Sequence, residues 1–183
     1  MMTEMEKGIQ RTLISEEDIR RRVAELGREV SEIYRGKDLL LVTVLKGAVV
    51  FLTDFMRQLD CHCELDFMVA SSFCGGTQST GVLRILKDLD TPIEGRNVLI
   101  VEDILDSGVT LSRIKSMLES RGPTSVRIVT LLDKPVRRKA DLEADFTGFV
   151  IPDEFVVGYG LDYDEKYRNL PFIGILKPEV YTK

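Results

Sequence analysis

The chain has 183 residues, of which 44% are hydrophobic, and it carries a formal net charge of −5. This length suits a single domain with a full hydrophobic core, and the acidic balance argues against broad binding to nucleic acid. No hydrophobic run approaches the length of a membrane span and the N-terminus lacks a signal-peptide core, so we expect a cytoplasmic protein.

The first clear element is an amphipathic helix. Ser15 predicts its N-cap, an acidic first turn follows, and we expect the helix to end near Gly36. Its apolar residues recur at steps of four and three, as a single buried helix face requires, at Ile19, Val23, Leu26, Val30 and Ile33.

A near-continuous apolar run at residues 39–45 predicts a strand covered on both faces, as in a parallel sheet. Lys46-Gly47 follows this strand, and residues 49–56 have a helical pattern. Residues 65–70 and 82–86 predict two further strands.

The cysteines have an odd count of three, which is typical of reduced thiols in the cytoplasm. Cys61-His62-Cys63 invites a metal-binding interpretation, but it offers too few ligands and lacks both zinc-finger spacing and a second cluster. We therefore expect these cysteines to pack as small apolar residues in or near a strand.

Segment 71–81 is small, polar and glycine-rich, which makes it too hydrophilic for the core. It is either a plain hairpin connection or a lid that closes over a reactive intermediate and excludes water.

The most informative stretch begins with an apolar strand at residues 98–101. The acids Glu102 and Asp103 follow, and then a polar turn at residues 106–110. A helical pattern runs on from Leu111 until Arg121-Gly122-Pro123 stops it.

The residues of this turn suit a phosphate. Gly108 lets backbone N–H groups face a ligand, and the N-terminus of the next helix adds partial positive charge. Ser107 and Thr110 add hydroxyl groups. The carboxylates of Glu102 and Asp103 are acceptors, which suit a sugar's vicinal hydroxyls or Mg²⁺. A ribose 5-phosphate carries both features, although each residue alone would be ordinary in a loop.

Further strands are predicted at residues 126–132, 146–151, 155–157 and 172–176. Strands and helices alternate through the middle of the chain, which predicts an α/β fold with a doubly wound, mostly parallel sheet flanked by helices. In such a fold ligands bind at the carboxyl ends of the strands. The candidate polar residues each follow a predicted strand, at Lys46, residues 102–110, Lys134 and Asp162.

Residues 102–110, EDILDSGVT, resemble the phosphoribosyl pyrophosphate (PRPP) signature of type I phosphoribosyltransferases. They are not a Walker A loop, since no Gly-Lys-Ser/Thr is present. From residue 39 to residue 176 the chain resembles the hypoxanthine-guanine phosphoribosyltransferases. The other segments that carry this resemblance are 45–47 (LKG), 72–73 (SF), 131–134 (LLDK) and 155–163 (FVVGYGLDY).

The resemblance implies one phosphoribosyltransferase domain over residues 1–183. Its core would span about residues 37–150, and a small hood would be formed by the N-terminal segment and residues 151–183. It also implies Mg²⁺-dependent transfer of the phosphoribosyl group from PRPP to N9 of a 6-oxopurine, as in purine salvage, by a homodimer or homotetramer.

The resemblance implies a role for each matching residue. Asp106 would be the general base beside purine N7. PRPP would be held by Glu102, Asp103, Asp106, Ser107, Gly108, Val109 and Thr110. Pyrophosphate would be held by Lys46, Gly47 and Arg168, with a cis peptide bond between Leu45 and Lys46. The purine would be bound by Lys134, Phe155, Val156 and Asp162. Mg²⁺ would be bound by Asp162, Glu102 and Asp103.

Some assignments stay open at this point. Taken alone, Phe155 would fit a core aromatic and Arg168 a surface charge. Arg138 is a candidate for assisting near pyrophosphate, whereas Arg137 and Lys139 are expected at the surface.

In the mobile loop that the resemblance implies, the family's usual Ser-Tyr is Ser72-Phe73 here, so the phenolic hydroxyl is missing. A xanthine-preferring sister enzyme and a nucleic-acid-binding regulator on the same fold are the alternatives to a hypoxanthine-guanine enzyme.

Overall fold

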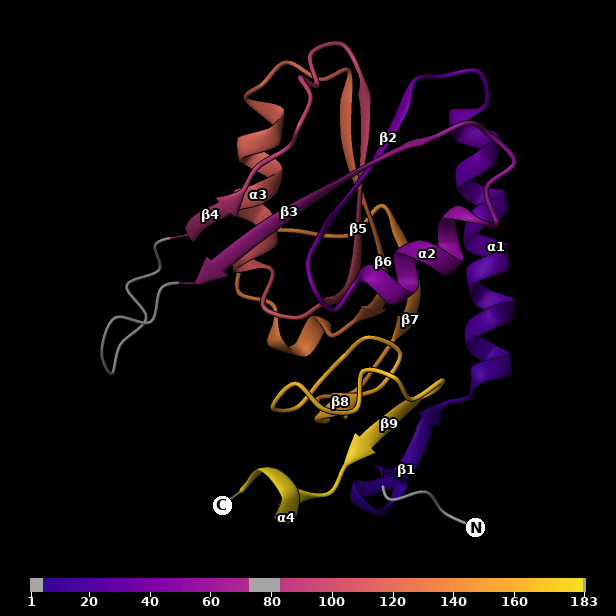
Figure 1. The fold of residues 1–183 in the computed structure, drawn as a ribbon, viewed down its shortest axis with the longest axis vertical. Coiled ribbons are helices and arrows are strands. Elements are labelled where there is room, and N and C mark those ends of the chain that lie inside the picture. Colours follow the sequence, from indigo (N-terminus) through magenta and orange to yellow (C-terminus); the bar gives the residue numbers. More distant parts are fainter. Residues whose placement is uncertain (1–4, 73–82, 183) are drawn as a thin grey trace.

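The computed structural model describes residues 5–72 and 83–182, and within them a six-stranded sheet has the strand order β4-β3-β2-β5-β6-β7 (Figure 1). Its neighbouring strands pair in parallel except β4, which is antiparallel to β3 at one edge. The strands are β2 (Leu39–Val44), β3 (Glu64–Ser72), β4 (Leu83–Lys87), β5 (Asn97–Leu105), β6 (Ser125–Asp133) and β7 (Phe146–Val150). The predicted mostly parallel sheet is confirmed.

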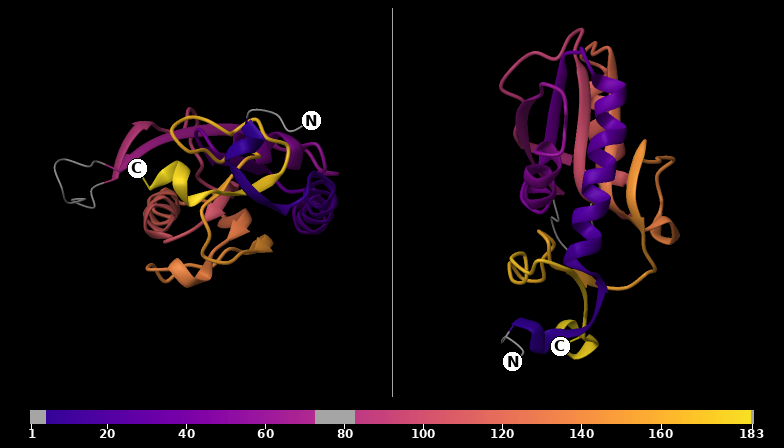
Figure 2. Two further views of the ribbon diagram at one scale, coloured as in Figure 1. Left: turned by 90° about the horizontal axis from the view of Figure 1, so that it is seen from below. Right: turned by 90° about the vertical axis from the view of Figure 1, so that its right-hand side faces the viewer.

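Helices cover both faces of this sheet (Figure 2). They are α1 (Glu16–Tyr34), α2 (Val49–Met56) and α3 (Val109–Glu119). Successive residues of β5 point to opposite faces: Leu99 and Val101 pack in one cluster with α1 and α2, and Val98 and Ile100 pack in another with α3. The strand is apolar at every one of these positions because each face has its own core.

Helix α1 begins as the sequence predicts. The Ser15 hydroxyl accepts a hydrogen bond from the backbone N–H of Asp18 at 3.1 Å, which caps the helix N-terminus. The predicted apolar face is buried apart from Ile33, which is partly buried. Cys61 and Cys63 also pack against this cluster as free thiols, and burial raises the pKa of both.

The two ends of the chain form a second, smaller sheet with the order β1-β9-β8 (Figure 1). Figures 1 and 2 show it beyond the carboxyl ends of the parallel strands. Its strands are β1 (Ile9–Ile14), β8 (Val156–Val157) and β9 (Ile173–Leu176). The short helices η1 (Met5–Gly8), η2 (Pro135–Arg137) and α4 (Pro178–Tyr181), like β1, were not predicted.

Several strand boundaries differ from the sequence expectation. Glu102 and Asp103 lie within β5, because β5 stays paired with β6 as far as Leu105. Strand β3 likewise runs on to Ser72, where it pairs with β4. Phe155 precedes β8 instead of starting it. Phe73 lies outside the described residues.

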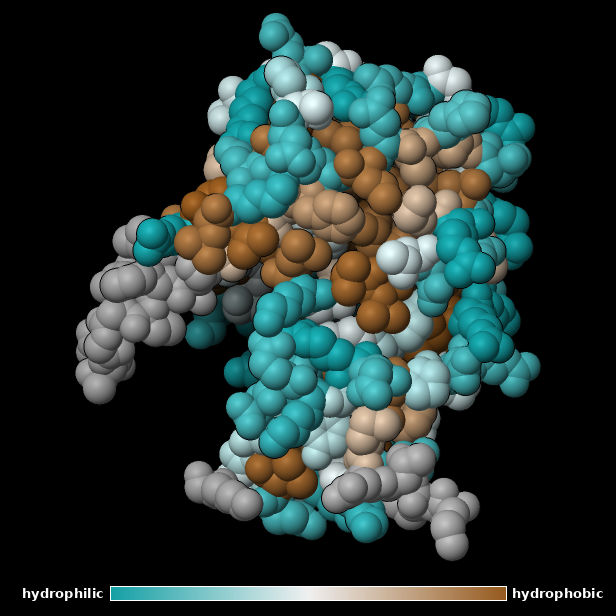
Figure 3. Space-filling view, in the orientation of Figure 1, coloured by the Kyte–Doolittle hydropathy of each residue, from teal (hydrophilic) through white to brown (hydrophobic). Residues whose placement is uncertain are grey.

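On the face shown in Figure 3, hydrophobic residues gather over β3 and β4, and hydrophilic residues cover the loop between β8 and β9. Leu86 of β4 is 56% exposed. None of the described helices is long and apolar enough to cross a membrane.

Candidate active site

The candidate site lies where β2, β5 and β6 end side by side. A cavity of about 300 Å³ opens there between the β2–α2 turn and the β5–α3 turn. The predicted site residues that line it are Lys46, Gly47, Glu102, Asp103, Asp106, Ser107, Gly108 and Thr110. Parallel pairing brings these two turns together, although more than fifty residues separate them in sequence.

The β2–α2 turn approaches the end of β5 very closely. The expected cis peptide bond between Leu45 and Lys46 is present. Gly47 packs against the carboxylate of Asp103, and a Cβ atom at residue 47 would collide with it. Gly160, with φ +102°, lies against the Gly47 carbonyl in the same way. Residue 160 must be glycine because the Gly47 backbone and the positive φ leave no room for a side chain, and a side chain at residue 47 would displace the Asp103 carboxylate.

The two acids of β5 are partly buried and close to each other. Burial, together with the Asp103 charge, holds the pKa of Glu102 well above its usual range. Burial likewise raises the pKa of Asp103 to about 6, against the lowering effect of Arg168 and of a 2.7 Å hydrogen bond from the Ile104 N–H. The cavity therefore favours a cationic ligand beside these acids.

The β5–α3 turn presents backbone N–H groups to the cavity. Gly108 adopts the left-handed conformation at φ +74° and α3 starts at the next residue. No side chain of the described residues caps this helix N-terminus. Its first N–H groups are thus available to an anion, and the helix dipole favours negative charge there. Val109 and Thr110 form the first helical turn instead of the preceding loop.

Arg138 supports this turn from behind. Its guanidinium donates hydrogen bonds to the carbonyls of Leu105, Asp106 and Leu142, and it is paired with the Asp133 carboxylate. Its side chain also passes beneath Gly108. Arg138 was a candidate for assisting near pyrophosphate, and that assignment stays a prediction; in this structure its guanidinium donors are bonded to the protein itself. Arg137 and Lys139 are exposed, as expected.

Three further backbone hydrogen bonds hold the same turn. The N–H groups of Lys139 and Ala140 both donate to the Ser107 carbonyl, at 2.9 and 3.1 Å. The N–H of Lys134 donates to the Leu105 carbonyl at 3.0 Å. The turn after β5 is therefore fixed by the segment that follows β6.

Asp106 extends from this turn into the cavity. One of its carboxylate oxygens, Oδ1, is buried without a hydrogen-bond partner in the described part of the chain, and lies 3.6 Å from the Arg137 guanidinium. A buried polar atom left without a partner marks a position where a ligand group can bind. The Nε of Arg168 is buried and without a partner in the same sense.

The residues predicted to bind a purine do not line this cavity, but Lys134 is joined to its wall because the Lys134 N–H donates to the Leu105 carbonyl. Lys134 is only 4% exposed and its ammonium donates to the Glu154 carbonyl at 2.8 Å. Phe155 directly follows Glu154 and is 38% exposed, which excludes the alternative that it is a core aromatic. Val156 is buried in β8, so only its backbone could contact a ligand.

Arg168 and Lys46 share an acidic partner that sequence reasoning missed. Lys46 lies 3.2 Å from the Glu165 carboxylate, and Arg168 lies 3.3 Å from it. Arg168 also pairs with Asp162 at 2.9 Å and donates to the Gly160 carbonyl, so it is not a free surface charge. Nothing in the sequence distinguishes Glu165 from its exposed acidic neighbours.

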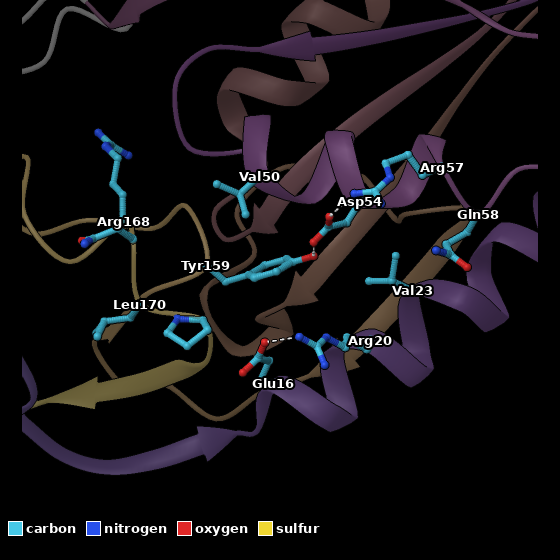
Figure 4. Close-up of a pocket in the computed structure, with 12 residues that line it drawn as sticks. Glu16, Arg20, Val23, Val50, Asp54, Arg57, Gln58, Tyr159, Arg168 and Leu170 are labelled. Atoms are coloured by element: carbon cyan, nitrogen blue, oxygen red, sulfur yellow. Dashed lines mark hydrogen bonds and ion pairs between the residues drawn. The ribbon is translucent and has the colours of Figure 1, made fainter. Parts of the chain in front are cut away.

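A larger cavity of about 670 Å³ lies between α1, α2 and the loop that carries Tyr159 and Arg168 (Figure 4). The Tyr159 hydroxyl donates to Asp54 of α2 at 2.7 Å across it, and Glu16 pairs with Arg20 along α1. Burial and this acidic partner raise the pKa of Tyr159. The Tyr159–Asp54 hydrogen bond ties the loop to α2. Because the polar groups of this cavity pair with one another, we do not take it as the candidate site.

The donor groups fit Mg²⁺ only together with a ligand. Among the described residues no group of three or more Cys, His, Asp or Glu side chains forms a ready metal site. Mg²⁺ in phosphate-handling sites is commonly held by one or two carboxylates, with water and phosphate oxygens completing the shell. Asp103 and Asp162 are close enough to influence each other electrostatically, so they suit that role.

Residues 9–164 match the family of phosphoribosyl transferase domains. The chain is 52% identical over 179 residues to a hypoxanthine-guanine phosphoribosyltransferase from Streptococcus thermophilus, covering 98% of this chain and 99% of the relative. The chain belongs to the hypoxanthine-guanine phosphoribosyltransferase family.

Two other relatives bear on the length and the fold. A bifunctional protein TilS/HprT from Listeria monocytogenes is 53% identical, and this chain spans 28% of its length. A crystal structure of a hypoxanthine phosphoribosyltransferase from Staphylococcus aureus is similar over the full length of both chains, with a TM-score of 0.96 and 53% identity.

Asp103→Asn is expected to stabilise the free protein at pH 7.5 by about 2–3 kcal/mol. Burial raises the pKa of Asp103 on folding from an ordinary value of 3.8 to about 6. The ionised carboxylate therefore costs stability increasingly above about pH 4, and the full cost is reached above about pH 6. The gain should vanish near pH 4, where the carboxyl is protonated in the folded state. Urea unfolding of the variant and of wild type at both pH values measures this difference in the free energy of unfolding. Asp141→Asn, at an exposed carboxylate, is the control, and an equal gain at pH 4 would contradict the cause given.

Arg138→Lys is expected to weaken binding of ribose 5-phosphate by about 10- to 100-fold, because an ammonium cannot hold three carbonyls and a carboxylate at once. Isothermal calorimetry measures the affinity. Arg22→Lys is the matched control, since Arg22 also donates to two backbone carbonyls, those of Thr147 and Gly148, but away from the cavity. Equal affinity in the Arg138 variant and in wild type would exclude a role for Arg138 in shaping the turn.

Proposed function

We propose that the protein transfers the 5-phosphoribosyl group of PRPP to N9 of a 6-oxopurine, hypoxanthine or guanine, giving the nucleoside 5′-monophosphate and pyrophosphate. This is a purine salvage reaction. The observation that carries the proposal is the single cavity in which the uncapped N-terminus of α3 lies next to Asp106 and the two acids of β5. The relatives' names give the same activity.

The turn after β5 binds the 5′-phosphate. Backbone N–H groups from Ser107 to Thr110 donate to the phosphate oxygens, with Gly108 and Val109 supplying main-chain groups only. The hydroxyls of Ser107 and Thr110 add donors. Glu102 and Asp103, at the other end of the same cavity, accept hydrogen bonds from the ribose 2′- and 3′-hydroxyls.

Asp106 lies between these two ends and acts as the general base. Its buried Oδ1 accepts the proton from purine N7 while N9 attacks the anomeric carbon and pyrophosphate departs. The Arg137 guanidinium lies 3.6 Å from the same oxygen.

Lys134 and Phe155 bind the purine. The Lys134 ammonium can only donate hydrogen bonds, so it binds the oxygen of a 6-oxo group and disfavours a 6-amino group. Its hydrogen bond to the Glu154 carbonyl places it next to Phe155, whose exposed ring stacks on the base. The backbone of Val156 and of Asp162 contacts the edge of the base.

Lys46, Gly47 and Arg168 bind pyrophosphate. The two cations pair with Glu165 in the free protein, and the more highly charged pyrophosphate replaces that carboxylate. Mg²⁺, held by Asp162 with help from Glu102 and Asp103, supplies neutralisation of the leaving pyrophosphate when bound. The raised pKa values of Glu102 and Asp103 are consistent with a site that is completed by a cation.

We propose a cytoplasmic location and a homodimer or homotetramer. The free thiols of Cys61 and Cys63 support the first proposal. The hydrophobic residues over β3 and β4 support the second, because exposed apolar patches commonly mark protein contacts. The net charge of −5 counts against a nucleic-acid-binding regulator on this fold.

The preferred base is tested by PRPP-dependent turnover of hypoxanthine, guanine, xanthine and adenine side by side. We expect turnover of hypoxanthine or guanine and, because Lys134 only donates, at least about 10⁴-fold lower kcat/KM for adenine. Preference for xanthine would point to the sister enzyme. Absence of PRPP-dependent turnover with every base would contradict the proposed function.

Asp106→Asn is expected to lower kcat by about 10²- to 10⁴-fold with PRPP binding largely kept, because the amide cannot accept a proton from N7. Steady-state kinetics and PRPP affinity measure the two effects separately. Unchanged turnover would remove Asp106 from the role of base.

A further inference from the structure

Phe155 packs against two aromatic rings that have no role in the reaction described above. The ring of Tyr181 stacks on the Phe155 ring at a centroid distance of 4.8 Å and an interplanar angle of 18°. The Tyr163 ring lies 5.7 Å from the Phe155 ring at an interplanar angle of 85°, in a T-shaped arrangement. With both aromatic partners in place, Phe155 stays 38% exposed.

Phe155 lies between α4 and the end of β6. Tyr181 belongs to α4, which lies beyond the small sheet, at the end of the molecule away from the six-stranded sheet (Figures 1 and 2). Lys134, at the end of β6, donates to the Glu154 carbonyl, just before Phe155 in the chain. Tyr181 thus stacks on Phe155 from α4, and Lys134 holds the chain next to Phe155 from the sheet that carries the candidate active site.

The polypeptide holds Tyr181 in place through several contacts. The N–H of Leu176 donates to the Phe155 carbonyl, and that of Lys177 donates to the Gly8 carbonyl, each at 2.9 Å. Pro178 then starts α4, in which Val180 and Tyr181 pack against the apolar cluster of the small sheet. The stack is therefore built on the sheet that also carries Phe155.

We propose that Tyr181 is a positioning residue for the purine: it backs one face of Phe155 and so fixes the orientation of the ring whose other face receives the base. This inference rests on the proposed function. A free phenyl side chain loses rotational freedom when a base stacks on it, and a ring already held by a neighbour loses less. Offset aromatic stacking of this kind also has a favourable energy of its own.

The test compares Tyr181→Leu with Tyr181→Phe, using Val180→Ala as the matched control on α4. Tyr181→Leu should raise the KM for hypoxanthine about 3- to 10-fold, with kcat and the KM for PRPP nearly unchanged. Tyr181→Phe keeps the ring and should behave as wild type. Val180→Ala loosens the packing of α4 but keeps the stack, so it should leave the purine KM unchanged.

A binding measurement separates positioning from general loosening of the fold. Tyr181→Leu should weaken calorimetric binding of inosine 5′-monophosphate by the same factor and leave binding of ribose 5-phosphate unchanged. Equal loss for both ligands, or an equal effect of Val180→Ala, would overturn the inference. A lower purine KM in Tyr181→Leu would also overturn it, since Tyr181 would then occupy the place of the base. Wild-type turnover of 6-oxopurines in the same assay shows whether the proposed function itself holds.

Discussion

The parallel pairing of β2, β5 and β6 is the constraint on which the site depends. Because their carboxyl ends meet at one edge, the chain can place a cis turn, an acid pair and a helix N-terminus around one small cavity. The approach of Gly47 to Asp103, and of Gly160 to Gly47, shows how little space remains between these segments. Substituting a larger residue at either glycine would push the turns apart before it touched any ligand.

Electrostatic cost accompanies this crowding. Two acids adjacent in β5 are buried near each other, and the pKa of each is raised mainly by that burial. A sequence that served stability alone would not place them there, so the free protein carries a local penalty that a bound cation and substrate hydroxyls can relieve. The unpartnered oxygen of Asp106 and the Nε of Arg168 belong to the same pattern.

Much of the fold and the cavity could be predicted from sequence, because the signals are local. Apolar runs gave the parallel strands, and the spacing from Ile19 to Val30 gave α1. The extent of β5 was missed because two acids, Glu102 and Asp103, interrupt its apolar run, while its backbone stays paired with β6 as far as Leu105. Strand β1 was missed because its pairing with β9 joins the two ends of the chain. Arg138, Glu165 and Tyr181 act through contacts between segments far apart or in loops, which no periodicity reveals.

The backbone bond from Lys134 to Leu105 has a geometric consequence. It joins Lys134, the residue proposed to bind the base, to the end of β5, which leads into the turn proposed to bind the phosphate. The bonds from Lys139 and Ala140 to Ser107 extend that link. The distance between the proposed base-binding and phosphate-binding groups is thus set by main-chain hydrogen bonds. A ligand whose base and phosphoryl group are too far apart or too close together would be rejected by that spacing, whatever the chemistry of its ends.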